Sequence, residues 1–230
     1  MERTKKIIYV ASLAGLLPGT PGHSHQAVRD IAALSAIPGL IMIEPSCERE
    51  VGLALNFCLH RTHESCYLRL VSVPCEVPYT LPSNYGLELG KGTVLNEGND
   101  ALMFAYGPVL LPQAFKASNM LREQYGFGLK VVNLPWLNKV DLGWLNKIAK
   151  DYAWIFTLDN HYIKGGQGGM IASCLLEAGL SSSFHLKKYG VLDIPFCGQN
   201  EEVLKAHGLD ADSLVEDIAQ SLMLAEAKSS

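Results

Sequence analysis

Long apolar runs, basic clusters and repeated segments are all missing from this sequence, and each absence excludes a class of protein. No stretch approaches the roughly 18 apolar residues of a membrane span. The 19 basic and 23 acidic residues include no basic run, so we expect neither a nucleic acid nor a membrane as partner. With 230 residues, 48% of them hydrophobic, the chain can bury a full core in one large or two small domains.

The cysteines are scattered and include no CxxC pair: Cys47, Cys58, Cys66, Cys75, Cys174 and Cys197. This spacing favours reduced thiols over a disulfide framework or a zinc site, and it indicates a reducing compartment. The apolar run at residues 7–17 imitates a secretory signal, but Tyr9, Ser12 and Gly15 interrupt it and no A-x-A-like cleavage site follows closely. We therefore expect a cytoplasmic protein.

Short apolar strands alternate with helical segments, which predicts an α/β fold with parallel sheets and helical crossovers. In the first part, helices are expected after the capping residues Ser24 and Ser46, and strands at residues 6–12, 40–44 and 66–73. In the second part, the expected strands are 100–106, 130–133, 153–158 and 184–187, and the expected helices are 111–125, 141–150, 166–178 and 212–223.

Prolines and glycines between residues 74 and 92 indicate an ordered linker between two domains. We expect a partial doubly wound parallel-sheet domain at residues 1–78 and a linker at 79–92. A second, three-layer α/β domain with a mainly parallel sheet is expected at residues 93–230.

Two histidines, His23 and His25, lie in a glycine-rich loop at residues 15–26 that joins the first strand to the next helix. Open α/β sheets place their ligands at such positions. The glycines permit backbone conformations closed to other residues, and amides at a helix start can face an anion or an enolate oxygen. The alternative interpretation is a plain strand-to-helix turn with two exposed histidines.

Two further clusters are weaker candidates for a functional site. His60, His63 and Cys66 could share a helix face and suit zinc, but Cys66 should begin a strand, so we expect no metal site. The glycines of residues 165–169 open a helix after a strand, yet they lack the G-x-G-x-x-G spacing of a dinucleotide cradle. Close packing of that helix against the sheet is the expected reason for them.

Several segments, in matching order and spacing, resemble the transketolase family. Residues 9–26, YVASLAGLLPGTPGHSHQ, resemble the family's A-S/T-H-A-G-L strand and the T-H-Q element after it, and residues 67–70, YLRL, are similar to its Y-I-R-L strand. KGTVLNEGND and LDNHYIKGGQGGMIA, in the second half, resemble the opening and the glycine-rich element of the family's carboxyl-terminal domain. The resemblance covers nearly the whole chain.

This resemblance implies the later half of a pyrimidine-binding domain followed by a transketolase carboxyl-terminal domain. In that family, thiamine diphosphate and Mg²⁺ lie between domains that usually belong to different protomers. The chain would be the carboxyl-terminal subunit or section of a split enzyme that transfers a two-carbon ketol or acyl unit, and it would be inactive alone. A partner subunit in an oligomer would carry the diphosphate-binding domain, the missing half of the pyrimidine domain and most contacts to both cofactors.

The resemblance also assigns roles to residues. His25 would stabilise or protonate a cofactor-bound intermediate. The residues that would face substrate or cofactor are Gly22, His23, Ser24 and Gln26, and further candidates are Arg69, Ser72 and His161.

The chain departs from the family at groups near the reactants. The family's acidic pair falls on Thr20 and Pro21, a histidine falls on Leu13, and its phosphate-gripping arginine falls on Ser72. Because a bidentate arginine is the strongest side-chain grip on phosphate, we expect a small ketose or 2-oxoacid in place of an ordinary pentose phosphate.

Two alternatives remain open. The first is the beta subunit of a 2-oxoacid dehydrogenase, which the missing phosphate grip allows, although the YLRL and DNH elements fit transketolases better. The second is a non-catalytic assembly protein or a truncated gene product, which the start at the strand edge of a half-sheet favours.

Overall fold

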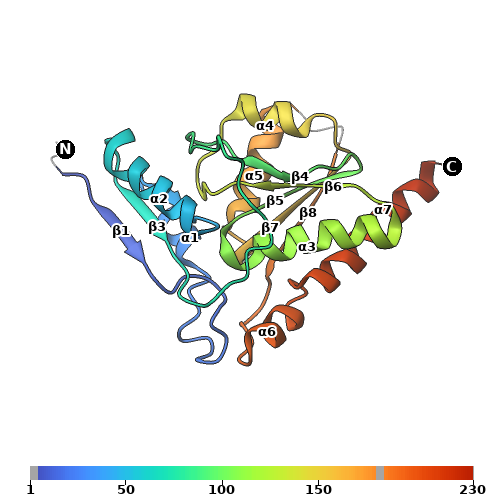
Figure 1. The fold of residues 1–230 in the computed structure, drawn as a ribbon, viewed down its shortest axis with the longest axis horizontal. Helices are drawn as coiled ribbons and strands as arrows, with labels where there is room; N and C mark the ends of the chain where they lie inside the picture. Colours follow the sequence, from blue (N-terminus) through green and yellow to red (C-terminus); the bar gives the residue numbers. More distant parts are fainter. Residues whose placement is uncertain (1–4, 180–183, 230) are drawn as a thin grey trace.

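The computed structural model describes residues 5–179 and 184–229, which form two α/β units side by side (Figure 1). The first unit is a parallel sheet in the order β1-β3-β2. Its strands are β1 (Ile8–Ala11), β2 (Ile41–Ile43) and β3 (Cys66–Arg69). Its helices are α1 (Asp30–Leu34), α2 (Glu48–Asn56) and the π-helix η1 (Phe57–Arg61), which continues α2.

The second unit is a sheet in the order β4-β6-β5-β7-β8, with β4 as its one antiparallel strand. Its strands are β4 (Thr93–Asn96), β5 (Ala101–Ala105), β6 (Leu129–Asn133), β7 (Trp154–Tyr162) and β8 (His185–Val191). Its helices are α3 (Gly107–Tyr125), α4 (Leu142–Ala149), α5 (Gln167–Glu177), α6 (Asn200–Ala206) and α7 (Ala211–Ser229).

Helices cover both faces of the second sheet and give it three layers (Figure 1). Along β5, Met103 and Ala105 share a core with residues of α3 and α7, whereas Leu102 and Phe104 share a core with residues of α4 and α5. Successive side chains of a strand point to opposite faces, so a strand between two helical layers must be apolar throughout. The expected fold class, a partial parallel-sheet domain followed by a three-layer domain with a mainly parallel sheet, is confirmed.

The start of α1 differs from the expectation that Ser24 caps it. The helix begins at Asp30, and Arg29 is its N-cap. The preceding residues are held in two successive turns, because the Gly22 N–H donates to Gly19 and the His25 N–H donates to Gly22, each at 3.0 Å. Ser24 therefore lies in a turn and caps nothing.

Other boundaries also need correction. Cys47, and not Ser46, is the N-cap of α2. The Ser46 N–H donates to the Glu50 side chain at 2.7 Å, which ties the residue before the cap to the first turn of the helix. The pattern does not predict β4 or α6, which are short and rich in polar residues. β3 ends at Arg69, earlier than expected, whereas β7 and β8 extend to Tyr162 and Val191 because they continue to pair with each other.

The two edges of the first sheet have different surroundings. Residues 135–137 of the second unit cover β2, where the Glu44 N–H donates to the Pro135 carbonyl at 2.9 Å. β1 pairs only with β3, and Tyr9 and Val10 are 51% and 57% exposed. In the described part of the chain, the outer edge of β1 is therefore open.

The segment between β3 and β4 is tied to α2 although it contains no helix or strand. The guanidinium of Arg49 donates, at 2.9–3.2 Å, to the carbonyls of Leu81, Pro82, Ser83 and Tyr85. The segment is thereby ordered against the first unit, and the domain limits at residues 1–78, 79–92 and 93–230 stay a prediction.

A glycine at each end of α3 tests the packing between the units. Gly107 and Gly126 both have positive φ, 72° and 77°, so alanine at either position should cost about 1 kcal/mol in backbone strain. A Cβ on Gly107 would also collide with the Glu44 carboxylate, whereas a Cβ on Gly126 would have no atom within 4 Å. In urea unfolding, Gly107→Ala should lose about 2 kcal/mol more stability than Gly126→Ala. Equal losses would show that Glu44 does not pack tightly there.

Candidate functional site

The predicted loop at residues 15–26, called the His25 loop below, follows β1 at the carboxyl end of the first sheet. The side chains of His23, Ser24 and His25 are exposed. The Ser24 hydroxyl lies 2.9 Å from Nδ1 of His25, whereas Nε2 of His23 lies 2.8 Å from the Arg29 guanidinium. Because Nδ1 of His25 is engaged, Nε2 is the nitrogen that can exchange a proton with a reactant.

Gln26 and Gly22 lie inside the loop, away from the solvent. Gln26 is only 3% exposed, and its side-chain amide donates to the carbonyls of Leu16 and Phe196, each at 3.0 Å. Gly22 is buried and has a φ of 76°, a conformation that glycine adopts without strain. The loop thus presents His23, Ser24 and His25 outward, and the roles of all five residues stay predictions.

Arg69 lies at the end of β3, without exposed surface, at the centre of a buried ion network. Its guanidinium donates to Asp30 at 2.7 Å, to Glu44, and to the Asn160 carbonyl of the second unit at 2.9 Å. Burial would raise the pKa of Asp30, but the charge and hydrogen bonds of Arg69 outweigh burial and hold that pKa below its ordinary value. Burial outweighs Arg69 at Glu44 and raises the pKa of that carboxyl. Engaged in this way, Arg69 joins the two units and is not placed to grip a phosphate.

Ser72 and His161 occupy very different environments. Ser72 is exposed beyond β3, and its hydroxyl donates to the Ser12 carbonyl. His161 is buried in β7, where Nδ1 donates to the Tyr162 carbonyl at 2.8 Å and Nε2 accepts the Ala32 N–H at 3.4 Å. Burial lowers the pKa of His161, so its ring is neutral near pH 7 and links α1 to the second sheet.

The glycine-rich turn before α5 is filled by a carboxylate of the protein itself. Asp159, buried in β7, accepts the N–H groups of Gln167 at 2.7 Å and Gly168 at 2.9 Å. A Cβ on Gly166 or Gly168 would collide with Asp159. Burial raises the pKa of Asp159 to about 6 despite these hydrogen bonds. The interpretation as packing residues is thus confirmed for Gly166 and Gly168, whereas a Cβ on Gly169 would have no atom within 4 Å. An external phosphate would find this helix start occupied.

Sequence reasoning missed three residues that shape this region: Glu44, Asp159 and Asn160. Each is a fully buried polar side chain: Glu44 directly follows the apolar strand β2, and the other two lie in the second half of β7. A buried charge needs a partner, so an acidic residue directly after or within such a strand is a signal that could have found two of them.

The described residues also bear on metals and membranes. Within residues 5–179 and 184–229, no three His, Cys, Asp or Glu side chains are grouped so that they could hold a metal ion. In the same ranges, no helix has both the length and the apolar character needed to cross a bilayer. The six cysteines are free thiols, and Cys66 begins β3 as expected.

His161 should make folding stability depend on pH. Its pKa in the folded state is below the ordinary value of 6.5, so below about pH 6.5 the unfolded chain takes up a proton that the folded chain does not. The free energy of unfolding of wild type should therefore exceed that of His161→Gln by its full amount at about pH 7.5. This difference should shrink by up to about 1.4 kcal/mol at about pH 5.5. Urea unfolding at both values measures this, with exposed His60→Gln as the control for loss of an imidazole. A difference between wild type and His161→Gln that does not change with pH would contradict a buried neutral ring.

Comparison with known proteins places the chain in a family. Residues 90–214 match the family profile "Transketolase, C-terminal domain". The chain is 29% identical to a Methanocaldococcus jannaschii protein named "Putative transketolase C-terminal section", over 93% of this chain and 65% of that protein. It is 27% identical to an apulose-4-phosphate transketolase subunit of Actinobacillus succinogenes, over 91% of this chain and 65% of that one. It is 26% identical to the 1-deoxy-D-xylulose-5-phosphate synthase of Trichormus variabilis, over 94% of this chain and 33% of the synthase.

A solved structure described as a split gene transketolase, inactive beta4 tetramer, superposes with a TM-score of 0.81 at 27% identity. The match covers 94% of this chain and 67% of that one. Against the two curated relatives with transketolase names, the chain spans 65% of their length. The family profile matches more than half of the chain, and so the predicted resemblance is confirmed: the chain belongs to the transketolase family and carries its carboxyl-terminal domain.

Proposed function

We propose that this chain is the carboxyl-terminal subunit or section of a split, thiamine-diphosphate-dependent enzyme that transfers a two-carbon ketol or acyl unit. The observation that carries the proposal is the similarity, over 94% of the chain, to a chain described as a split gene transketolase. The Actinobacillus succinogenes relative, which is named as one subunit of a transketolase, supports the same division between polypeptides.

Thiamine diphosphate, when bound, supplies the carbanion chemistry of such an enzyme. The described residues of this chain do not fit the metal-diphosphate part of the site: they contain no three-ligand metal group, and Asp159 already fills the helix start after residues 165–166. They do fit a reactant-facing role, because the exposed imidazole of His25 stands at the carboxyl end of the first sheet. The diphosphate and Mg²⁺ would therefore be held mainly by a partner chain.

His25 is the residue to which we assign proton transfer. With Nδ1 fixed by the Ser24 hydroxyl at 2.9 Å, Nε2 would carry or accept the proton at a reactant atom. His23 is held differently, by Arg29, whose guanidinium also lies 5.4 Å from the centroid of the Tyr162 ring. It would line the site without exchanging a proton.

We expect this chain to bind no phosphate group of the substrate at the end of β3. Ser72 offers a neutral hydroxyl turned to the backbone, and the donors of Arg69 are engaged inside the protein. Two relatives carry names of phosphorylated sugars. The missing phosphate grip at β3 outweighs these names, and we propose an unphosphorylated ketose or a 2-oxoacid in place of an ordinary pentose phosphate. A beta-type 2-oxoacid dehydrogenase subunit and a non-catalytic assembly protein are the alternatives.

Replacing His25 tests the catalytic assignment. In the reconstituted enzyme, His25→Ala should lower turnover about 10²-fold to 10⁴-fold, the usual effect of losing a positioned acid or base, while the unfolding transition stays the same. His23→Ala is the matched control, two residues away in the same loop, and it should be mild. A damaging His23→Ala beside a mild His25→Ala would overturn the assignment.

The need for a partner gives a second test. The isolated chain should show no thiamine-dependent turnover, and activity should appear when a chain with the diphosphate-binding domain is added. We propose that this partner covers the open edge of β1, where Lys is disruptive. Val10→Lys should weaken association at least about tenfold, whereas Leu176→Lys, at the same exposure of 57% on α5, should not.

The outcomes separate the candidate functions. Micromolar binding of thiamine diphosphate with turnover by this chain alone, measured by calorimetry and assay, would refute the split site. Association that restores no activity with any substrate would favour the assembly protein. Ribose 5-phosphate turned over better than unphosphorylated sugars or pyruvate would refute the substrate proposal.

A further inference from the structure

The tip of the His25 loop rests on a segment of the second unit. This segment, residues 196–200, follows β8 and ends at the first residue of α6; Figure 1 shows the loop after β1 beside α6. The Gly19 N–H donates to the Asn200 side chain at 3.1 Å, and the Gly198 N–H donates to the Gly19 carbonyl at 3.4 Å. The Cys197 thiol donates to the Thr20 carbonyl at 3.1 Å. The contact thus joins backbone groups of the loop tip to both backbone and side-chain groups of residues 197–200.

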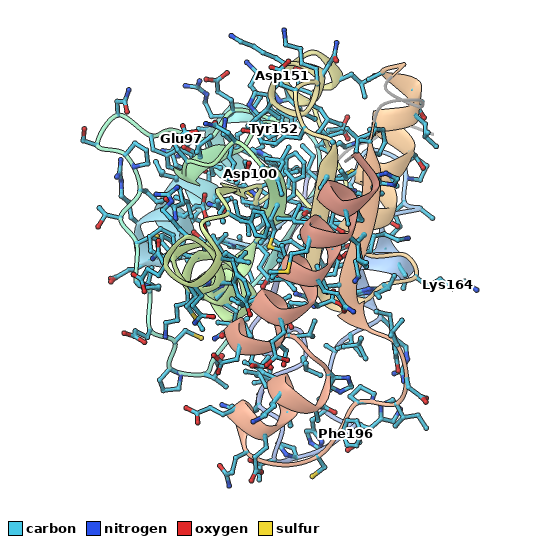
Figure 2. The ribbon with its side chains drawn as sticks, turned by 90° about the vertical axis from the view of Figure 1, so that its right-hand side faces the viewer. Glu97, Asp100, Asp151, Tyr152, Lys164 and Phe196 are labelled. Carbon is cyan, nitrogen blue, oxygen red and sulfur yellow. The ribbon has the colours of Figure 1, made fainter. Side chains whose placement is uncertain are left out.

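The packing at this contact leaves no room for a side chain. A Cβ on Gly19 would lie 2.5 Å from a methyl group of Val203 and 2.9 Å from the Gly198 carbonyl oxygen. Figure 2 shows Phe196 at one end of the second unit and Asp100, Asp151 and Tyr152 toward the other, where β5 and β7 begin. The segment therefore meets the His25 loop at the carboxyl end of the second sheet.

Gln26 makes the same connection from the base of the loop. Its amide nitrogen divides its two hydrogens between the Leu16 carbonyl of the loop and the Phe196 carbonyl of the segment, each at 3.0 Å. Its side-chain oxygen is buried and has no hydrogen-bond partner among the described residues. The donors, and not the acceptor, are therefore what the protein uses at this position.

Apart from residues 196–200, the protein holds the backbone of the loop mainly at its ends. At the base, Gly15 pairs with Ala27 of the first unit, and the Leu16 N–H donates to the Asn160 side chain, in β7 of the second unit, at 2.9 Å. Between residues 19 and 25, the backbone passes through two turns whose hydrogen bonds, at Gly22 and His25, stay within the loop. The position of the tip relative to the sheets is consequently set by residues 196–200.

We infer that residues 196–200 of the carboxyl-terminal domain, together with Gln26, position His25. Gln26 is then a positioning residue: it does not face a reactant but fixes the backbone that carries its neighbour His25. The part of this inference that concerns turnover rests on the proposed role of His25, whereas the part that concerns the geometry of the loop does not.

Hydrogen exchange measured by mass spectrometry on the isolated chain tests the geometry. Asn200→Ala removes the acceptor of the Gly19 N–H, and Gln26→Glu keeps the size of the side chain but removes both donors. Asn200→Ala, which loses one hydrogen bond, should speed exchange of the loop peptide about fivefold to tenfold, and Gln26→Glu, which loses two, at least as much. Neither should change exchange in β5 or β7. Asn200→Asp keeps the acceptor and should restore the wild-type rate.

Asn146→Ala, an exposed change on α4 in the same unit, is the matched control and should leave the loop unchanged. Wild-type exchange of the loop in both Asn200→Ala and Gln26→Glu would overturn the inference. If Gln26→Glu does not fold, Asn200→Ala with its Asp rescue decides the question alone.

Turnover in the reconstituted enzyme tests the link to His25. Gln26→Glu should lower kcat about tenfold to 100-fold, the cost of a misplaced catalytic group. In a His25→Ala background, the same change should cost less than about twofold, because two residues that act through one step are not additive. Additive losses would overturn the positioning of His25 by Gln26. A neutral His25→Ala would instead refute the proposed function, and the exchange result would still decide the geometry.

Discussion

The buried guanidinium of Arg69 is the interaction on which the arrangement of both units depends. It gathers the carboxylates of Asp30 and Glu44 from its own unit and the Asn160 carbonyl from the other. Loss of one partner from such a group leaves a charge without compensation, at a typical cost of about 3–5 kcal/mol. Because the carboxyl ends of β3 and β7 meet here, the network also fixes the base from which the His25 loop departs.

Much of this molecule follows from local patterns in the sequence. The alternation of apolar strands and helices predicts the two parallel sheets, and the glycines of residues 15–26 mark the loop that carries His25. Gly166 and Gly168 are likewise explained by packing, since Asp159 occupies the space that a side chain would need there. Periodicity and turn chemistry act over a few residues, so they can be read from one segment at a time.

The rest depends on contacts between distant parts of the chain. Helix α1 begins later than expected because the loop before it is held in turns. Gln26, in that loop, is hydrogen-bonded to Phe196, 170 residues away. The resemblance makes Arg69 a candidate for facing substrate or cofactor, yet its partners come from α1, the end of β2 and the end of β7. A strand such as β4, short and half polar, exists because β6 supplies its hydrogen bonds. Tertiary contacts override local propensity at each of these places.

The difference between the two edges of the first sheet has a consequence for assembly. Residues 135–137 occupy the β2 side permanently, so the sheet can be extended in one direction only, beyond β1. One open edge accepts one strand, and a second copy of the chain and a different polypeptide would compete for it by mass action. For the split enzyme proposed above, the relative amounts of this chain and its partner in the cell would then decide which assembly forms.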